Sequence, residues 1–252
     1  MGRVHLSIAD AIATIELDNP ASHNAVDAPM RDELAAAYAR VESDESVRVA
    51  IIRGSEGASF CAGGSIDGYL ERGVFGPDGA HLPRIPRPHP ATKPYIAAMN
   101  GYALGGGFAL ALACDLRIAG RSARMGPTGL KLGAVQGAQT ISRLTRLIGA
   151  SKALEVLLLS KRLTADEAVG MGLVHAVVDD DQVLDTAREW AATIAGFSPW
   201  TVAMTKKLVY EAQHLPLEDA MAWEDEVATE AYRRPEALEG FTAFKEGRRA
   251  KF

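Results

Sequence analysis

The sequence predicts an α/β fold in which strands alternate with crossover helices. Short runs of β-branched and apolar residues, typical of buried strands, recur at residues 47–52, 94–99 and 116–119. Helical spacing separates these runs, and the last part of the chain carries helical patterning alone. We therefore expect a core over residues 1–195 and a helical C-terminal region over residues 196–252.

The N-terminal elements are a predicted hairpin and a predicted helix. Residues 4–8 and 11–17 alternate apolar with polar or small residues, as two antiparallel strands do. Asp27 is suited to cap a helix that has Pro29 in its first turn. Apolar residues then recur at helical spacing, at Met30, Leu34, Ala37 and Val41.

Later elements have equally local signals. Gly105–Gly107 opens an apolar helix that should end near Cys114. Thr164 and Glu167 form the pattern of a capping box, which starts another helix. Residues 173–178 resemble a last strand. Ser198-Pro199 begins another helix, and helical patterning continues to Tyr232.

Bulk properties exclude several functional classes. The chain has 252 residues and a net charge of −5, so a basic surface for nucleic acid is not indicated. Its two cysteines, Cys61 and Cys114, have no metal-ligand spacing, and we expect no metal site. The N-terminus lacks a signal-peptide layout, and no apolar stretch reaches membrane-spanning length. We expect a cytoplasmic protein with no membrane partner.

Three glycine-containing segments are candidates for a site, at residues 59–65, 100–108 and 126–133. A single cluster of this kind more often makes a turn than a site. However, glycine beside a helix N-terminus leaves backbone N–H groups accessible, and two such groups can converge on one oxyanion.

Two other interpretations of these glycines fail. A dinucleotide-binding fingerprint requires Gly-x-Gly-x-x-Gly with an acidic residue about 20 positions later. The spacing of Gly101–Gly107 is wrong, and Asp115 comes too early. A nucleophile elbow requires Gly-x-Ser-x-Gly, and Asp67 occupies the second glycine position after Ser65.

The order and spacing of five motifs resemble the crotonase (enoyl-CoA hydratase/isomerase) superfamily over essentially the whole chain. The motifs are Phe60–Gly64, Lys93-Pro94 followed by Asn100–Gly107, Cys114–Ala119, the capping box with Gly170–Val174, and Gly240–Arg248.

The resemblance implies a spiral of ββα units followed by a C-terminal helical trimerisation region, in a homotrimer or a dimer of trimers. It also implies an enzyme that binds an acyl-CoA thioester and stabilises the enolate of that thioester. The two oxyanion-hole N–H groups would be those of Gly64 and Gly106, which are the implied catalytic residues.

The implied coenzyme A contacts come from two segments and a neighbouring subunit. The adenine would lie near Ala62 and the loop of residues 19–25. Phe244 of a neighbouring subunit would cover the adenine. No other cofactor is expected, because coenzyme A is part of the substrate. The implied binding residues are Ser22, His23, Ala25, Ala62, Gly63 and Phe244. A lysine common in hydratases is Gly247 here, and Lys245, Arg248 or Arg249 could replace its charge.

The sequence departs from hydratases at both catalytic glutamates. Their positions hold Ala109 and Gly129. Because each general acid–base group contributes about 10²–10⁴-fold to the rate, efficient hydration is not expected. The aspartate of dienoyl isomerases would fall near Gly137, where it is also absent.

The motif Thr128-Gly129-x-Lys131-x-Gly133 resembles the 1,4-dihydroxy-2-naphthoyl-CoA synthase branch. That branch has an aspartate where this chain has Gln136. Its bicarbonate-holding Gln and Trp are Pro127 and Leu157 here.

Further polar candidates lie in and before the segment 73–90, which is expected to be a mobile loop beside the site. Asp67 is suited to the first turn of a helix, and Tyr69 could point inward. The loop itself contains four basic candidates, His81, Arg84, Arg87 and His89. Any one of them alone is more often a solvated charge, but as a cluster they could bind a substrate carboxylate or the coenzyme A phosphates.

Three functions remain open at this point. The first is an acyl-CoA enzyme that needs no glutamate pair, such as a decarboxylase or a C–C bond lyase or hydrolase. The second is a hydratase or isomerase that uses Gln136 or a loop histidine. The third is a non-catalytic acyl-CoA carrier. The intact pair Gly64 and Gly106 favours the first function over the third.

Overall fold

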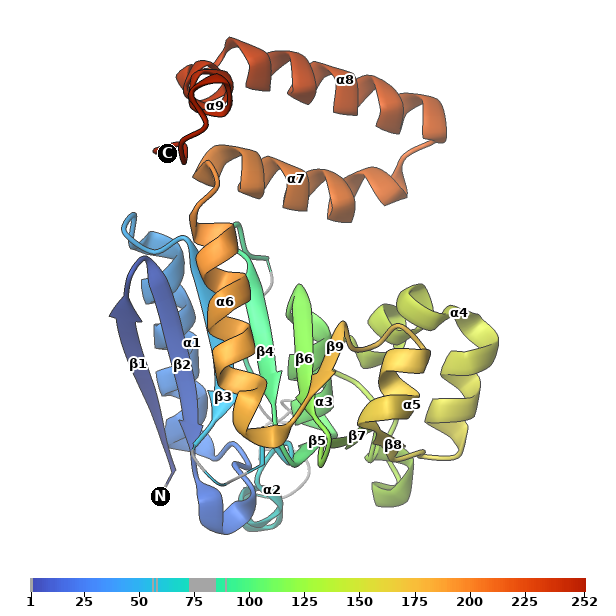
Figure 1. Ribbon diagram of the computed structural model, residues 1–252. Coiled ribbons are helices and arrows are strands. Elements are labelled where there is room, and N and C mark those ends of the chain that lie inside the picture. The colour runs from blue at the N-terminus through green and yellow to red at the C-terminus, as the bar shows by residue number, and fades with distance from the viewer. Residues whose placement is uncertain (1, 56, 58, 73–84, 89) are drawn as a thin grey trace.

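The computed structural model describes residues 2–55, 57, 59–72, 85–88 and 90–252. Within them, two sheets and their helices form one body, and the C-terminal helices form a separate layer beside it (Figure 1). Most of the loop expected over residues 73–90 lies outside the described residues.

The larger sheet has six strands in the order β1-β2-β3-β4-β6-β9. The first two strands form the expected antiparallel hairpin, and every later pairing in this sheet is parallel. The strands are β1 Arg3–Ala9, β2 Ile12–Asp18, β3 Val49–Gly54, β4 Tyr95–Met99, β6 Leu116–Gly120 and β9 Ala176–Val178.

Both faces of this sheet are covered, which explains the continuous apolar runs. In β3, Ala50 and Ile52 pack in the cluster that includes helix α1 (Ala28–Ser43). The alternate residues Val49 and Ile51 pack in a second cluster with helix α6 (Val183–Ala195).

A smaller sheet contains β5 (Tyr102–Leu104), β7 (Arg124–Gly126) and β8 (Leu163–Thr164). Strands β5 and β7 are parallel, and β7 and β8 are antiparallel. Helix α3 (Gly106–Ala113) starts directly after β5, so the small sheet fixes the start of this helix.

The predicted helix caps are confirmed. An Asp27 carboxylate oxygen accepts a hydrogen bond of 3.0 Å from the Met30 N–H at the start of α1. The Thr164 hydroxyl accepts from the Glu167 N–H at 3.1 Å, and the Glu167 carboxylate accepts from the Thr164 N–H at 2.9 Å. This reciprocal pair starts helix α5 (Ala165–Gly170).

One predicted boundary is wrong. The strand expected over residues 173–178 contains only Ala176–Val178. Gly172 turns the chain with φ +76°, and Leu173 and Val174 are apolar because their side chains are buried, not because they lie in the strand. Helical patterning was expected from Ser198 to Tyr232, and two helices occupy most of this range, α7 (Pro199–Glu211) and α8 (Leu217–Arg233). Between them Leu215 is extended, a conformation that the residue before a proline favours.

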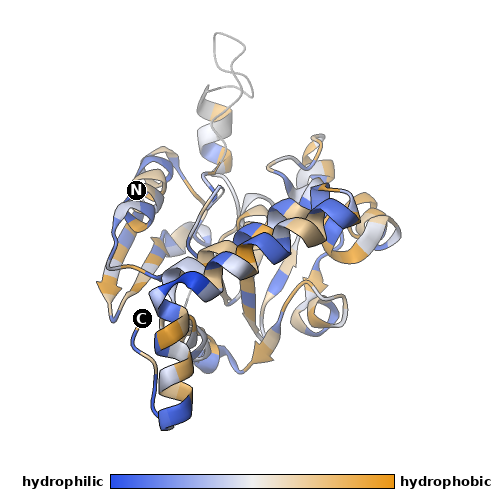
Figure 2. Ribbon diagram, turned by 90° about the horizontal axis from the view of Figure 1, so that it is seen from above, coloured by the Kyte–Doolittle hydropathy of each residue, from blue (hydrophilic) through white to orange (hydrophobic). Residues whose placement is uncertain are grey.

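Helices α7, α8 and α9 (Pro235–Glu246) form the separate layer at one end of the large sheet (Figure 1). One anchor for α7 is the Lys206 ammonium, which lies 2.8 Å from an Asp115 carboxylate oxygen. The Tyr210 hydroxyl donates to the other oxygen of that carboxylate at 2.9 Å. In the view from above, α9 and α2 (Ile66–Arg72) lie at opposite ends of the molecule (Figure 2). No described helix is both long and apolar enough to cross a bilayer.

Candidate active site

The first predicted oxyanion donor, Gly64, lies in a segment held between β5 and the chain at Val26. The Cys61 N–H donates to the Tyr102 carbonyl at 2.8 Å. Val26 donates to the Gly63 carbonyl at 2.8 Å and accepts from the Ser65 N–H at 3.0 Å. This is the hydrogen-bond pattern of a parallel bridge between Val26 and Gly64. In such a bridge the N–H of Gly64 points away from Val26, so it is not used in this pairing.

The second predicted donor, Gly106, is the first residue of α3. Gly105 precedes it with φ +54°, a conformation that favours glycine, and the Gly105 N–H donates to the Gly126 carbonyl at 2.9 Å. The first hydrogen bond of the helix runs from the Ala109 N–H to the Gly105 carbonyl at 3.1 Å. The Gly106 N–H is therefore one of those that a helix N-terminus leaves without an intrahelical acceptor.

The two glycine segments pack backbone to backbone. A Cβ atom on Gly63 would lie 3.1 Å from the Gly106 nitrogen. A Cβ atom on Gly107 would lie only 2.0 Å from the Cys61 carbonyl oxygen. Glycine is needed at these contacts because a side chain would separate the segments. The structure thus brings the two predicted donors into neighbouring segments, as an oxyanion hole requires.

The predicted coenzyme A residues of one chain also come together. The Ala62 N–H donates to the His23 carbonyl at 2.9 Å, so the segment around Gly63 adjoins the loop that contains Ser22, His23 and Ala25. His23 has φ +51°, and one of its ring nitrogens, Nδ1, lies 3.2 Å from the Ser59 hydroxyl.

Asn24 is a structural residue of this loop that the sequence interpretation did not single out. It is fully buried and has φ +56°. Its side-chain amide donates to the Ser59 carbonyl at 2.5 Å and accepts from the Asn19 N–H at 2.7 Å. The turn-forming composition of residues 19–25 is the only signal that could have indicated this role.

Phe244 is the one predicted binding residue that lies far from the others in the chain. Its side chain is 88% exposed on α9, and Figures 1 and 2 both place α9 at the end of the molecule opposite α2. Within one chain, Phe244 does not reach the segment around Gly64, so its predicted role depends on a neighbouring subunit.

The two positions where hydratases have glutamates, Ala109 and Gly129, are both buried but have different surroundings. Ala109 lies inside α3 with 1% of its surface exposed. Gly129 is buried at the start of the short 3-10 helix η2 (Gly129–Leu132). A Cβ atom on Gly129 would lie 2.8 Å from the Ala134 carbonyl oxygen and 2.9 Å from the Gln136 nitrogen. A larger residue at position 129 would therefore require the backbone of this loop to move.

Gln136, considered above as a substitute for the glutamates, bonds to the backbone. Its amide oxygen accepts from the Thr128 N–H at 3.0 Å and from the Gly129 N–H at 2.9 Å. Its amide nitrogen donates to the Gly105 carbonyl at 3.4 Å. A carboxamide also has no proton that titrates near neutral pH, so this geometry favours a positioning role over acid–base catalysis.

The candidate polar residues after Gly64 are only partly described. His81, Arg84, His89 and the Tyr69 side chain lie outside the described residues. Asp67 is exposed in the first turn of α2, as expected. Burial raises the pKa of Tyr38 well above its usual value, and the nearby positive charge of Arg87 opposes this effect. The charge of Arg87 is therefore close enough to the buried Tyr38 hydroxyl of α1 to affect its pKa.

An apolar side chain and a thiol adjoin the two donors. A Cβ atom on Gly106 would lie 2.6 Å from the Ile85 Cδ1 atom, so Ile85 packs directly over this glycine. The Cys61 sulfur accepts from the Gly63 N–H at 3.4 Å. Burial raises the pKa of the Cys61 thiol to about 12, which disfavours a nucleophilic thiolate at neutral pH. No group of three or more potential metal ligands occurs among the described residues.

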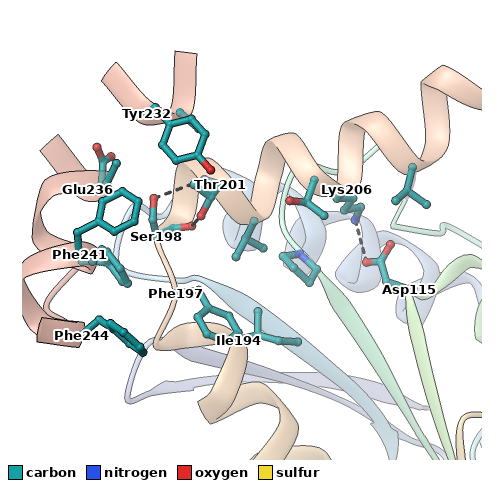
Figure 3. A pocket seen from close by; sticks show the side chains of 18 of the residues that line it. Asp115, Ile194, Phe197, Ser198, Thr201, Lys206, Tyr232, Glu236, Phe241 and Phe244 are labelled. Carbon is teal, nitrogen blue, oxygen red and sulfur yellow. Dashed lines mark hydrogen bonds and ion pairs between the residues drawn. The ribbon is translucent and has the colours of Figure 1, made fainter. Parts of the chain in front are cut away.

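A large apolar pocket of the described residues lies elsewhere. It has a volume of about 1000 Å³ and lies between α6, α7 and α9. Figure 3 shows Phe197, Phe241 and Phe244 on one side of it and the ion pair of Lys206 with Asp115 on the other. None of the predicted oxyanion residues lines this cavity, so we assign the candidate active site to the glycine segments.

Comparison with known proteins agrees with this fold and these motifs. The family model described as "Enoyl-CoA hydratase/isomerase" matches residues 7–252. A probable mitochondrial enoyl-CoA hydratase from Dictyostelium discoideum is 38% identical over 94% of this chain and 86% of its own length. The (E)-benzylidenesuccinyl-CoA hydratase of Thauera aromatica is 33% identical over 99% and 98% of the two chains.

Solved structures have the same architecture. The crystal structure of a probable enoyl-CoA hydratase/isomerase from Mycobacterium abscessus superposes with a TM-score of 0.93 at 30% identity, covering 100% of this chain and 99% of that one. The fold class predicted from the sequence, an α/β crotonase-like spiral, is thereby confirmed. The chain belongs to the enoyl-CoA hydratase/isomerase family, the crotonase superfamily.

Proposed function

We propose that this chain is an enzyme that binds an acyl-CoA thioester and stabilises its enolate between the N–H groups of Gly64 and Gly106. The observation that carries the proposal is the backbone packing of the two segments, in which a Cβ atom on Gly63 would lie 3.1 Å from the Gly106 nitrogen. Enolate formation places negative charge on the thioester oxygen. One well-aimed donor lowers the barrier by about 3–4 kcal/mol.

Coenzyme A binds, in this proposal, along the loop of residues 19–25 and at Ala62 and Gly63. Phe244 from a neighbouring subunit covers the adenine in a homotrimer or a dimer of trimers. The exposed aromatic side chains of α9 support this arrangement: Phe241 is 62% exposed and Phe244 is 88% exposed. Burying such surfaces between subunits is favourable by about 25 cal/mol per Å².

The proposed reaction does not use a glutamate pair. Neither Ala109 nor Gly129 has a carboxylate, and position 129 has no room for one without backbone movement. Decarboxylation fits such a site. The bond between the α-carbon and the carboxylate breaks, its electron pair forms the enolate, and CO₂ leaves without proton abstraction by the protein. A proton from solvent then completes the product.

Hydration is the second candidate because two of the relatives reported above are named hydratases. A third relative, from Proteus mirabilis, is named carnitinyl-CoA dehydratase and is 34% identical over 97% of this chain and 96% of its own length. Hydration by this chain would need acid–base groups other than those at positions 109 and 129.

Turnover on a small substrate panel tests the proposal. The panel contains crotonyl-CoA, a longer enoyl-CoA, a malonyl-type CoA and a cyclic β-ketoacyl-CoA, with products identified by mass spectrometry. Each substrate is tested with the wild type, with Gly106→Pro, which removes the N–H, and with Gly106→Ala, which keeps it. Proline is tolerated at the first position of a helix. Both substitutions add a Cβ atom whose closest contact, at 2.6 Å, is the movable end of the Ile85 side chain, so Gly106→Ala also controls for this contact.

Turnover of the malonyl-type or β-keto substrate that is lost in Gly106→Pro and retained in Gly106→Ala would support the proposed reaction. Fast hydration of crotonyl-CoA would instead establish the second candidate. Binding without any turnover would identify an acyl-CoA carrier. If calorimetry detected no binding of any CoA thioester, the proposal as a whole would be wrong.

A further inference from the structure

The Gln136 side chain connects the loop of residues 128–136 to the start of α3. Its amide oxygen receives two backbone N–H groups, from Thr128 at 3.0 Å and Gly129 at 2.9 Å. Its amide nitrogen faces the carbonyl oxygen of Gly105 at 3.4 Å. Only this orientation of the amide satisfies both sides, because the oxygen meets donors and the nitrogen meets an acceptor.

The Gly105 carbonyl belongs to the same peptide unit as the Gly106 N–H. A peptide unit is planar and trans, so its C=O and N–H point in opposite directions. Any group that holds the Gly105 carbonyl therefore also sets the direction of the Gly106 N–H. The Ala109 N–H holds this carbonyl from within α3 at 3.1 Å, and Gln136 holds it from outside the helix.

This peptide unit needs such restraint because Gly105 and Gly106 are both glycines. Glycine has the widest choice of backbone conformations, and Gly105 adopts φ +54° and ψ −112°. Thr128 adds a contact on the same side, since a Cβ atom on Gly105 would lie 2.5 Å from the Thr128 hydroxyl oxygen. The loop around Gln136 therefore packs directly against the peptide unit that carries the proposed donor.

We infer that Gln136 is a positioning residue: it aims the Gly106 N–H at the thioester oxygen by holding the Gly105 carbonyl. This inference rests on the proposed function, because it assigns a purpose to the second oxyanion donor. It also explains how the loop at Gly129, which has no catalytic carboxylate, contributes to the site through its backbone and through Gln136.

Gln136→Glu tests the inference most closely. The introduced carboxylate keeps an acceptor for the Thr128 and Gly129 N–H groups. It loses the donor and places an oxygen against the Gly105 carbonyl. Gln136→Met removes both the acceptor and the donor of the amide. Gln213→Met is the control, because it makes the same chemical change at an exposed helix end. Thermal unfolding of all variants identifies any loss of folding.

The probes are acetoacetyl-CoA, whose bound enolate is measured by its ultraviolet absorption, and butyryl-CoA, a saturated thioester that forms no stable enolate. We expect the affinity for butyryl-CoA to change less than about 3-fold in Gln136→Glu. The stabilisation of the acetoacetyl-CoA enolate should fall at least about 10-fold, below the 10²–10³-fold that loss of a whole donor typically costs. Gln213→Met should match the wild type in both measurements.

The outcomes separate this inference from the proposed function. Wild-type enolate stabilisation in Gln136→Glu would overturn the positioning role and leave the proposed function intact. Equal losses for both ligands would also overturn it, because they would show a purely structural role. If the wild type itself stabilised no enolate, the proposed function would fail and this inference with it.

Discussion

Replacing Gly129 with alanine should destabilise the protein, because the loop of residues 128–136 is closed around this glycine. The added Cβ atom would lie 2.8 Å from the Ala134 carbonyl oxygen, 2.9 Å from the Gln136 nitrogen and 3.0 Å from the Gln136 Cα atom. All three are backbone atoms, so no side-chain rotation relieves the contact.

The expected cost follows from overpacking and from the hydrogen bonds of the loop. Overpacking a filled site costs about 1–3 kcal/mol. A shift of the loop would also weaken the 2.9 Å hydrogen bond from the Gly129 N–H to Gln136, which contributes about 1 kcal/mol. Because residues 130–135 are exposed and can move outward, we expect a net loss of about 2 kcal/mol, or about 4–8 °C in Tm.

Thermal and urea unfolding, followed by circular dichroism at one protein concentration, measure this loss. Gly170→Ala is the matched control, since a Cβ atom there would meet no atom within 4 Å and alanine is the better helix former. Gly170→Ala should be neutral or slightly stabilising. A Gly129→Ala variant as stable as Gly170→Ala would refute the claim that the loop excludes a side chain at the second glutamate position.

Three further predictions concern the rest of the chain. Lys206→Met should cost about 2 kcal/mol in urea unfolding, because it removes the hydrogen bonds of this ammonium to the partly buried Asp115 carboxylate and to the Lys93 carbonyl, whereas Lys207→Met should cost less than about 1 kcal/mol. Native protein should resist alkylation by iodoacetamide at pH 8 and become reactive in urea, because burial raises the pKa of Cys61 and Cys114 to about 12. Hydrogen bonds from Arg248 and the chain after it lower the pKa of Glu239 from 4.5 to about 2, so this carboxylate stabilises the C-terminal segment above pH 4.5. That stabilisation should be lost as the pH falls toward 2. Hydrogen exchange of the backbone amides after α9, corrected for the intrinsic exchange rate, should then show reduced protection. Unchanged protection would contradict the lowered pKa of Glu239.

The sequence predicted the helices that begin with a capping side chain and the strands that are continuous apolar runs. Asp27 and Thr164 have the cap geometry that their sequence context indicated. The buried strands β3, β4 and β6 were found because both faces of the sheet are covered, which makes each strand a continuous apolar run.

The missed elements lack such signals. Helices α4 (Thr140–Leu158) and α6 start without a side-chain cap, and α4 contains Gly149 in a non-helical conformation. The strands of the small sheet contain two or three residues, too few for a period to be visible.

Within the site, the glycine segments could be located by their motifs, whereas the hydrogen bonds of Gln136 could not. The contact between Gln136 and Gly105 joins residues 31 positions apart, and only the fold brings them together. The same limit applies to Ile85, which lies over Gly106.

The most direct test of the central claim is a pH titration of acetoacetyl-CoA bound to the wild type, Gly106→Ala and Gly106→Pro, followed through the enolate absorption. Two converging N–H donors should lower the apparent pKa of enolisation by at least about one pH unit relative to the free thioester, equivalent to about 1.4 kcal/mol. Gly106→Ala should keep most of this shift, and Gly106→Pro should lose it. A bound ligand that enolises at the same pH as the free thioester, or a Gly106→Pro variant that keeps the full shift, would contradict the assignment of Gly64 and Gly106 as the oxyanion hole.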